Sequence, residues 1–297
     1  ESWLEVTESA LSSMSDVVTD MIDQCIKGSN EDLTTEDRET ILTALKALRD
    51  EVYATGNSDY AGRYIFTGYR TDTSLTFGET TEQEYSITEQ VDSTKLDMIT
   101  HVQTGSLLDI NETNYTNDGT NNTEDYKSVT EQQIDRNDVY RMRLSYDDVM
   151  GTVAADGIAD FGIQIYTGTT TDAAGNTIPQ FTDLKAVDLD GAGQGASYKS
   201  ASIYDAQNPY ENVGKNDIVL VKETGEMLLG KNVYDELMAK KDLPKTTDDE
   251  SEIRIVYDKS KWENHDLRPE HYFACTSTVD GKTIKYNEDY LKGISDE

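Results

Sequence analysis

A heptad pattern at the start of the chain limits what its first segment can fold into. Between residues 3 and 26, apolar or small side chains recur at alternating steps of three and four residues: Leu4, Thr7, Leu11, Met14, Val18, Met21 and Cys25. This spacing is typical of a helix that packs along a seam against another helix. Val17, Ile22 and Ile26 widen the seam on one flank. Because so wide an apolar face is not covered by one neighbour, it indicates more than one partner helix.

A second helix is predicted after a polar connection. Thr34 can serve as its N-cap, with Asp37 three residues later as an acidic variant of the capping box. The apolar positions of this helix are Ile41, Leu45, Leu48 and Val52. We expect the two helices to form an antiparallel pair. Two helices alone would leave several apolar side chains poorly covered, namely Val17, Ile22, Leu42 and Tyr53. A third helix from outside this chain is therefore expected to complete the bundle.

The residues after the second helix are rich in glycine and aromatic side chains. They include Asn57, Tyr60, Gly62, Arg63, Tyr64, Phe66 and Gly68, followed by Thr71, Asp72 and Thr73. Short aromatic runs broken by glycines indicate strands, so this motif predicts a joint between helices and β structure. The motif, together with the heptad helices before it, resembles the end of the N-terminal helical segment in the family of bacterial flagellar hook-associated protein 3. That family is related to flagellin and connects hook to filament.

The resemblance covers residues 1–77 and implies an α+β fold. Residues 1–77 would form a long antiparallel helical stalk with a β motif, similar to the D1 portion of flagellins. Residues 78–297 would form a β-rich variable head, which we expect to divide into two lobes near residues 208–217. Members of the family carry terminal helices at both ends, but no heptad follows Ile284 and the sequence begins at Glu1 rather than Met. We therefore expect natural terminal residues to be missing from this sequence.

The resemblance also implies a structural, non-enzymatic function at the hook–filament junction, outside the cell, after export by the flagellar secretion system. The helix seams would pack subunits together, and the joint motif would position neighbouring subunits. Partners would be hook-associated protein 1 type subunits, flagellin and further copies of this chain. Flagellin itself is the nearest alternative, although the run from Gly62 to Thr71 favours the junction protein. An alternative of another class is a secreted hydrolase or carbohydrate-binding head on a helical stalk, which would need a pocket of convergent titratable groups in the head.

Charge excludes several classes of partner. The 58 acidic and 26 basic residues give a net charge of −32. Such a surface repels the phosphates of nucleic acids and of anionic membranes, so neither is expected to bind. The sequence also contains no apolar run near the length of a membrane span. Cys25 and Cys275 are far apart in sequence, and we expect two buried free thiols rather than a disulfide.

The remaining sequence predicts short strands at 84–88, 139–146, 161–166, 217–221, 252–257 and 271–277, hairpin turns at Thr224-Gly225 and Asp280-Gly281, a short helix at 233–240, and polar loops at 111–125 and 188–200. No catalytic, cofactor-binding or metal-binding residues are expected. His265 and His271 are separated by a proline-containing segment that does not place both rings on one helix face. The loop around Gly191, Gly193 and Gly195 fits no phosphate-binding spacing. Asn111, Asn114 and Asn121 match the N-glycosylation pattern but are expected to be ordinary loop residues.

Overall fold

The computed structural model describes residues 2–30, 33–103, 135–239, 253–279 and 281–291. These residues form two compact units. The first holds Glu1–Ile87 and Lys259–Tyr290, and the second holds the described part of Thr88–Asp258. This division differs from the expected boundary at residue 77, because a late segment of the chain returns to the first unit. Neither boundary between the units falls near residues 208–217. The predicted loop at 111–125 and its glycosylation patterns lie outside the described residues.

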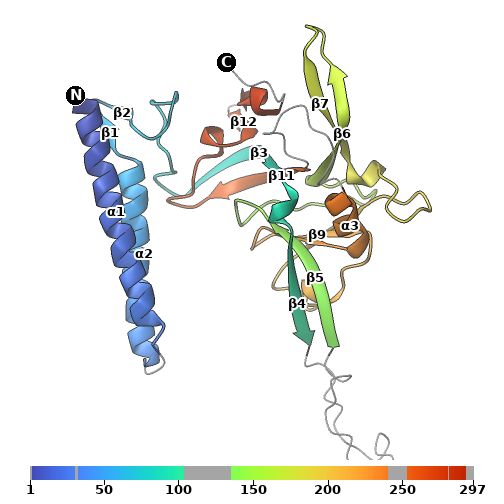
Figure 1. The fold of residues 1–297 in the computed structure, drawn as a ribbon, viewed down its shortest axis with the longest axis horizontal. Coiled ribbons are helices and arrows are strands. Elements are labelled where there is room, and N and C mark those ends of the chain that lie inside the picture. The colour runs from blue at the N-terminus through green and yellow to red at the C-terminus, as the bar shows by residue number, and fades with distance from the viewer. Residues whose placement is uncertain (1, 31–32, 104–134, 240–252, 280, 292–297) are drawn as a thin grey trace, which may run out of the picture. The chain divides into compact units, whose positions relative to one another are not determined.

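Two helices dominate the first unit. α1 (Ser2–Gly28) and α2 (Thr35–Gly56) lie side by side and run in opposite directions (Figure 1). The predicted capping box is confirmed. The Asp37 amide donates to the Thr34 hydroxyl at 3.2 Å, and the Thr34 amide donates to the Asp37 carboxylate at 3.1 Å. This exchange satisfies amides that the first turn of a helix otherwise leaves unpaired.

The first unit also contains two sets of strands. β1 (Asp59–Tyr60) and β2 (Arg63–Tyr64) form a small antiparallel hairpin. The larger set has the order β13-β12-β3-β11, with β3 (Thr81–Val91), β11 (Ile253–Trp262), β12 (Ala274–Val279) and β13 (Lys282–Tyr286). β3 up to Ile87 and β11 from Lys259 belong to this unit. Short 3-10 turns occupy Pro269–His271 and Glu288–Leu291.

The core of the first unit is aromatic. Phe77 stacks on Trp262 with ring centroids 4.8 Å apart, and Tyr85 meets both rings edge-on. The Trp262 indole N–H donates to the carbonyl of Gln83 at 2.7 Å. Lys259 is also buried here, with its amine 5.2 Å from the centre of the Trp262 ring and 3.9 Å from the Asp266 carboxylate. A buried lysine is tolerated because these two neighbours compensate its charge.

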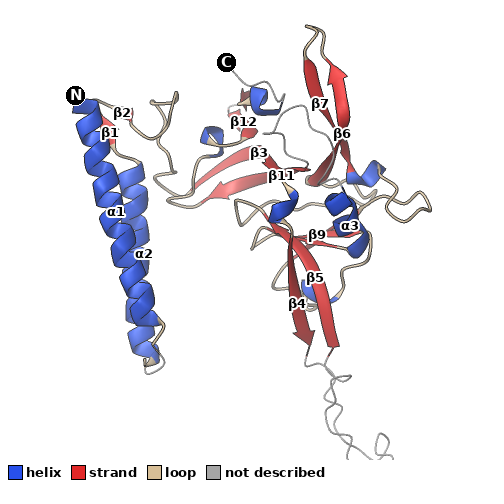
Figure 2. Cartoon of the chain, in the orientation of Figure 1, coloured by secondary structure: helices blue, strands red, loops and turns tan. Residues whose placement is uncertain are grey.

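The second unit is mainly β structure, as the colouring in Figure 2 shows. A five-stranded sheet has the order β4-β5-β10-β9-β8, with β4 (Asp97–Gln103), β5 (Asp135–Arg143), β8 (Ser197–Ala201), β9 (Asp217–Val221) and β10 (Glu226–Leu229). In the other set, β11 pairs with β6 (Gly162–Thr171), which pairs with β7 (Thr177–Asp183). β8 and β9 pair in parallel, whereas β10 pairs antiparallel with both β5 and β9.

The five-stranded sheet is the best-covered element of the second unit. Every residue of β9 and β10 is buried, and Val139, Val219, Val221 and Leu228 form one cluster. Helix α3 (Lys231–Ala239) buries Val233 and Leu237 and stacks Tyr234 on Tyr140 at 4.0 Å. Further 3-10 turns occupy Ser93–Lys95, Leu184–Ala186 and Pro209–Glu211.

Sequence patterns locate most of the predicted strands, the hairpins and the short helix, but not every strand. Residues 74–77, which follow the predicted joint, contribute one bridge, between Thr76 and Leu267. The predicted loop at 188–200 contains the start of β8, and β4, β7 and β13 are not predicted. β8 and β13 are mostly polar and exposed, so they lack the alternating apolar pattern on which a prediction depends.

Candidate functional site: an open helix face and a clamped joint

Helix α1 presents two adjacent apolar faces. The face turned towards α2 contains Trp3, Thr7, Ala10, Met14, Val17 and Met21, all buried or half-buried. A second row of apolar side chains is exposed, which we call the open face: Leu4, Leu11, Val18, Ile22 and Ile26. The contrast is sharpest between neighbours, since Val17 is 5% exposed and Val18 is 45% exposed. The two faces are offset by one residue, which is about 100° around a helix.

The structure therefore divides the predicted seam. Met14 and Met21 contact the α2 side as half-buried residues, whereas Leu4, Leu11 and Val18 lie on the open face. Cys25, predicted to be buried, is exposed beside this face. Val17, predicted to be poorly covered, is buried. These corrections share one cause: the apolar arc of α1 is wide enough to supply two seams, and the pairing with α2 uses the flank one residue earlier.

On α2, the predicted inward positions Ile41, Leu45, Leu48 and Val52 are all half-buried. Leu42 is exposed, as expected for a pair of helices without a third. Tyr53 is covered, but by an unexpected neighbour. Its ring stacks on His265 with centroids 5.5 Å apart and planes 6° from parallel.

The β1–β2 hairpin closes the joint next to the start of α1. Ala61 and Gly62 form its turn with φ angles of 54° and 76°, and the Asp59 carboxylate accepts the Gly62 amide at 3.1 Å. Two left-handed residues in succession are the geometry of a tight hairpin turn, which explains the glycine. Tyr60 stands edge-on to Trp3, and its hydroxyl lies 2.6 Å from that of Ser2. Arg63 is exposed, while Tyr64 and Phe66 are half-buried.

Asn57 links the end of α2 to residues 74–77. Its backbone N–H caps the helix by donating to the carbonyl of Tyr53 at 3.1 Å. Its side-chain amide donates to the Thr76 hydroxyl at 2.6 Å and accepts the Thr76 backbone N–H at 3.1 Å. Thr76 is fully buried, so both bonds are shielded from water.

A segment from far along the chain completes the joint, and sequence reasoning missed it. The Phe77 amide donates to the Asp266 carbonyl at 2.9 Å, and the His265 amide donates to the Phe77 carbonyl at 2.9 Å. The Arg268 amide donates to the Leu75 carbonyl at 3.0 Å. A ring nitrogen of His271, Nε2, lies 2.8 Å from the Ser74 carbonyl oxygen. The two histidines that bracket this segment thus hold the joint, and no local pattern could have indicated a pairing over such a distance.

The aromatic residues of the joint have unequal roles. Phe77 is buried in the core, whereas the Tyr69 side chain is fully exposed, so only part of the aromatic set packs as a core. Gly68, with a φ of 59°, precedes Tyr69 and turns it outward in a conformation that glycine adopts readily.

Burial raises the pKa of the Cys275 thiol, on β12 of the same unit, to about 12. That thiol is therefore unreactive at neutral pH.

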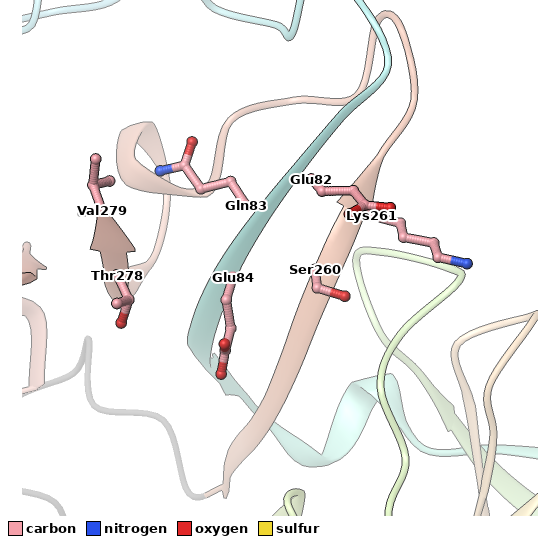
Figure 3. Close-up of a pocket in the computed structure, with 7 residues that line it drawn as sticks. All are labelled: Glu82, Gln83, Glu84, Ser260, Lys261, Thr278 and Val279. Carbon is pink, nitrogen blue, oxygen red and sulfur yellow. The ribbon is translucent and has the colours of Figure 1, made fainter. Parts of the chain in front are cut away.

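The described residues contain a groove across three strands, but its side chains are not arranged as in a catalytic site (Figure 3). A groove of about 580 Å³ crosses β12, β3 and β11 and is lined by Glu82, Gln83, Glu84, Ser260, Lys261, Thr278 and Val279. Figure 3 shows that these side chains do not converge, because Gln83 points towards β12 and the Lys261 amine points away from it. In the part of the chain that the structure describes, no three His, Cys, Asp or Glu side chains gather as a metal site would require. Nor does any helix in that part combine the length and hydropathy of a membrane span.

The fold and this site define an α+β protein that carries a pair of amphipathic helices with one apolar face left open. No protein-family model matches the chain. Over 103 residues it is 33% identical to flagellar hook-associated protein 3 of Salmonella typhimurium, and over 102 residues it is 32% identical to that of Escherichia coli. Over a third of its length, the chain is thus similar to flagellar hook-associated protein 3, as its joint motif indicates. The match spans 32% of the length of each relative.

A comparison with solved structures finds the crystal structure of the flagellar junction protein FlgL from Legionella pneumophila. The alignment covers 88% of this chain and 72% of that one, with 12% sequence identity and a TM-score of 0.26. This score is too low to support a statement about the fold.

Proposed function

We propose that this chain is a structural, non-enzymatic subunit of the bacterial flagellum that connects the hook to the filament. In this proposal α1 and α2 form a stalk, and helices of other segments or subunits cover its open face. The β-rich remainder forms the head. The protein acts outside the cell, after passage through the flagellar export channel. Because both cysteines are free thiols, no disulfide would hinder export of an unfolded chain.

The open face of α1 is the observation that carries the proposal. Five large apolar side chains follow one side of a helix of 27 residues, which is roughly 40 Å long. An exposed apolar surface of this length is costly in water and commonly marks a protein interface. The spacing of seven between Leu4, Leu11 and Val18 suits a further helix better than a globular partner, because knobs of one helix fit the holes of another at this repeat.

The similarity to flagellar hook-associated protein 3 supports assembly at the hook–filament junction. We propose hook-associated protein 1 type subunits, flagellin and further copies of this chain as the partners. Contacts that repeat between copies without closing on themselves would produce a ring or helical array. The joint, fixed by Asn57 and the segment around His265, would attach the stalk helices to the strands of the same compact unit.

Two other functions can be compared with this proposal: a flagellin filament subunit and a secreted hydrolase. Flagellin would use the same helix face, but the run from Gly62 to Thr71 and the named relatives favour the junction protein. A secreted hydrolase would need titratable groups that converge in a pocket. The groove across β3 and β11 shows no such convergence (Figure 3), and the similarity to flagellar hook-associated protein 3 is what favours the structural function.

Assembly onto purified hooks tests the proposal. The full-length protein, with its natural termini, is mixed with purified hooks and examined by electron microscopy. We expect the unchanged protein to add to hook ends and the variant Leu11→Glu/Val18→Glu to fail, because two carboxylates would be buried without partners in the helix contact. Ser9→Glu is the matched control, since it lies two residues from Leu11 and hence about 200° around the helix.

Circular dichroism of each variant checks that α1 and α2 remain helical. Assembly of Leu11→Glu/Val18→Glu at the unchanged level would refute a role for the open face. Absence of hook binding by the unchanged protein, together with hydrolytic activity, would refute the flagellar function as a whole.

A further inference from the structure

A cleft of about 530 Å³ lies beside the joint, within the first compact unit. Residues 66–70 line one part of it and residues 270–272 another, with Asn287 and Tyr290 completing the walls. The volume lies within the range of small-ligand sites. None of these residues belongs to α1 or α2, so the cleft is separate from the open face.

Aromatic rings form much of the cleft wall. Tyr69 is fully exposed, Tyr272 and Tyr290 are exposed over about half of their surface, and Phe66 is half-buried. Each tyrosine offers an apolar ring face together with a hydroxyl group. Such a wall suits a ligand that is apolar on one face and rich in hydrogen-bonding groups around its edge.

Polar atoms without partners accompany these rings. Within the described residues, Arg268 Nε, Glu270 Oε2 and His271 Nδ1 are buried and have no hydrogen-bond partner. Glu270 is only 5% exposed, and both it and His271 line the cleft. Buried polar groups left unpaired are destabilising and uncommon in folded proteins, so these atoms call for an external partner.

The hydrogen bonds that Glu270 and His271 already make indicate which donors or acceptors a ligand must supply. Arg268 Nη1 lies 3.2 Å from Glu270 Oε1, and the Tyr85 side chain also interacts with the Glu270 carboxylate. Since His271 Nε2 lies 2.8 Å from the Ser74 carbonyl oxygen, Nε2 must carry the proton and Nδ1 is left as an acceptor. Of the three unpaired atoms, Glu270 Oε2 and His271 Nδ1 belong to residues that line the cleft, and both are acceptors. A ligand that donates hydrogen bonds would satisfy these two.

Charge argues for a neutral ligand. Arg70 and Glu270 both line the cleft and carry opposite charges, and Arg268 adds a positive charge that is paired with Glu270. The Arg70 guanidinium lies 4.8 Å from the centre of the Tyr286 ring. Hydroxyl groups suit such a mixed site, because they donate to a carboxylate and accept from a guanidinium.

We propose that this cleft binds a neutral saccharide of one or two rings. Tyr69 would stack on the ring face, and Glu270, His271 and Arg70 would bond to its hydroxyl groups. Binding would give the protein an affinity for glycans at the joint, in addition to its proposed role in assembly and independent of it.

Saturation-transfer difference NMR with the 297-residue chain tests this proposal. The probes are glucose, galactose, mannose, N-acetylglucosamine, maltose and cellobiose, with sodium aspartate and arginine amide as charged comparisons. We expect saturation transfer to at least one sugar, and at least about tenfold weaker binding in Tyr69→Ala and in Glu270→Gln. Tyr204→Ala is the matched control, because Tyr204 is also a largely exposed tyrosine but belongs to the other compact unit.

Each outcome decides the matter. Loss of sugar binding in Tyr69→Ala with retention in Tyr204→Ala supports the assignment, and Tyr69 is so exposed that its removal should not unfold the chain. Glu270→Gln keeps the shape of the side chain and tests the carboxylate separately. The proposal is overturned if none of the sugars binds, if sugars bind equally to Tyr69→Ala, or if only aspartate or arginine amide binds.

Discussion

Asn57 at the end of α2 and Thr76, nineteen positions later, hold each other through two hydrogen bonds between the amide side chain and the threonine. The same asparagine caps α2 through its own backbone N–H. One residue therefore ends the helix and attaches the residues that lead into β3. This dual role explains why the joint motif begins with asparagine, since only an amide side chain both donates and accepts at this length.

Replacement of Asn57 by alanine should destabilise the first unit by about 1–3 kcal/mol, because the buried Thr76 amide and hydroxyl would lose their partner. Urea unfolding followed by tryptophan fluorescence measures this, since both tryptophans, Trp3 and Trp262, lie in that unit. Asn30→Ala, an exposed asparagine in the helix connection, is the control and should change stability by less than about 0.5 kcal/mol. Equal midpoints for the two variants would contradict the assigned role.

The left-handed backbone conformation of His265 is expected to cost stability, and two substitutions at this position can measure that cost. It has a φ of 80°, where residues other than glycine are strained, and its ring stacks on Tyr53. Both His265→Ala and His265→Gly lose the stack, but only glycine removes the strain. We expect the glycine variant to be more stable than the alanine variant by about 1 kcal/mol. The same urea titration gives this difference, and a more stable alanine variant would show that the left-handed conformation is not maintained.

Val17 and Val18 are adjacent in sequence but lie on different faces of α1. Val17→Ala should destabilise the helix pair by roughly 1–3 kcal/mol, because it removes buried methyl groups and leaves a cavity. Val18→Ala should change the stability of the isolated chain by less than about 0.5 kcal/mol, since its side chain is largely in water. Urea unfolding monitored by helical circular dichroism compares them. If Val18→Ala proved the more damaging in the monomer, the assignment of inner and open faces would be reversed.

Glu89 should make the second unit less stable as pH rises. The carboxylate is buried and accepts the Ser145 amide at 2.8 Å, and the Tyr257 hydroxyl also donates to it. Burial raises its pKa above the usual 4.5, although these hydrogen bonds oppose the change. The folded chain therefore holds this proton more tightly than the unfolded chain. As pH rises from 4.5 through the raised value, the folded state pays the cost of ionising a buried group, and stability falls.

Glu89→Gln removes that titration, so the difference in stability between variant and unchanged protein isolates it from the other carboxylates. We expect the difference to move in favour of the variant as pH rises above 4.5, whatever its value at low pH. Scanning calorimetry between pH 4 and 8 measures it. A difference that is constant with pH would rule out a raised pKa at this site.

Local sequence patterns predicted the structure correctly where the residues that interact are close in sequence. The capping box of Thr34 and Asp37 involves neighbours within one helical turn, and the hairpin at Thr224-Gly225 joins strands only a few residues apart. The heptad likewise indicated α1, because a helix repeats its faces along a short segment. Polar strands such as β8 and β13 escaped prediction, since their place in a sheet depends on the strands beside them rather than on their own side chains.

The amino-acid sequence by itself determined the two amphipathic helices, their capped start and the aromatic motif that follows them, together with the similarity that this motif carries. Only the tertiary structure decided which flank of α1 faces α2, because an apolar arc wide enough for two seams leaves the choice to the partner. It alone also brought residues 265–271 against 74–77. Backbone hydrogen bonds between segments so far apart carry no sequence signal, since every residue except proline offers the same N–H and C=O groups.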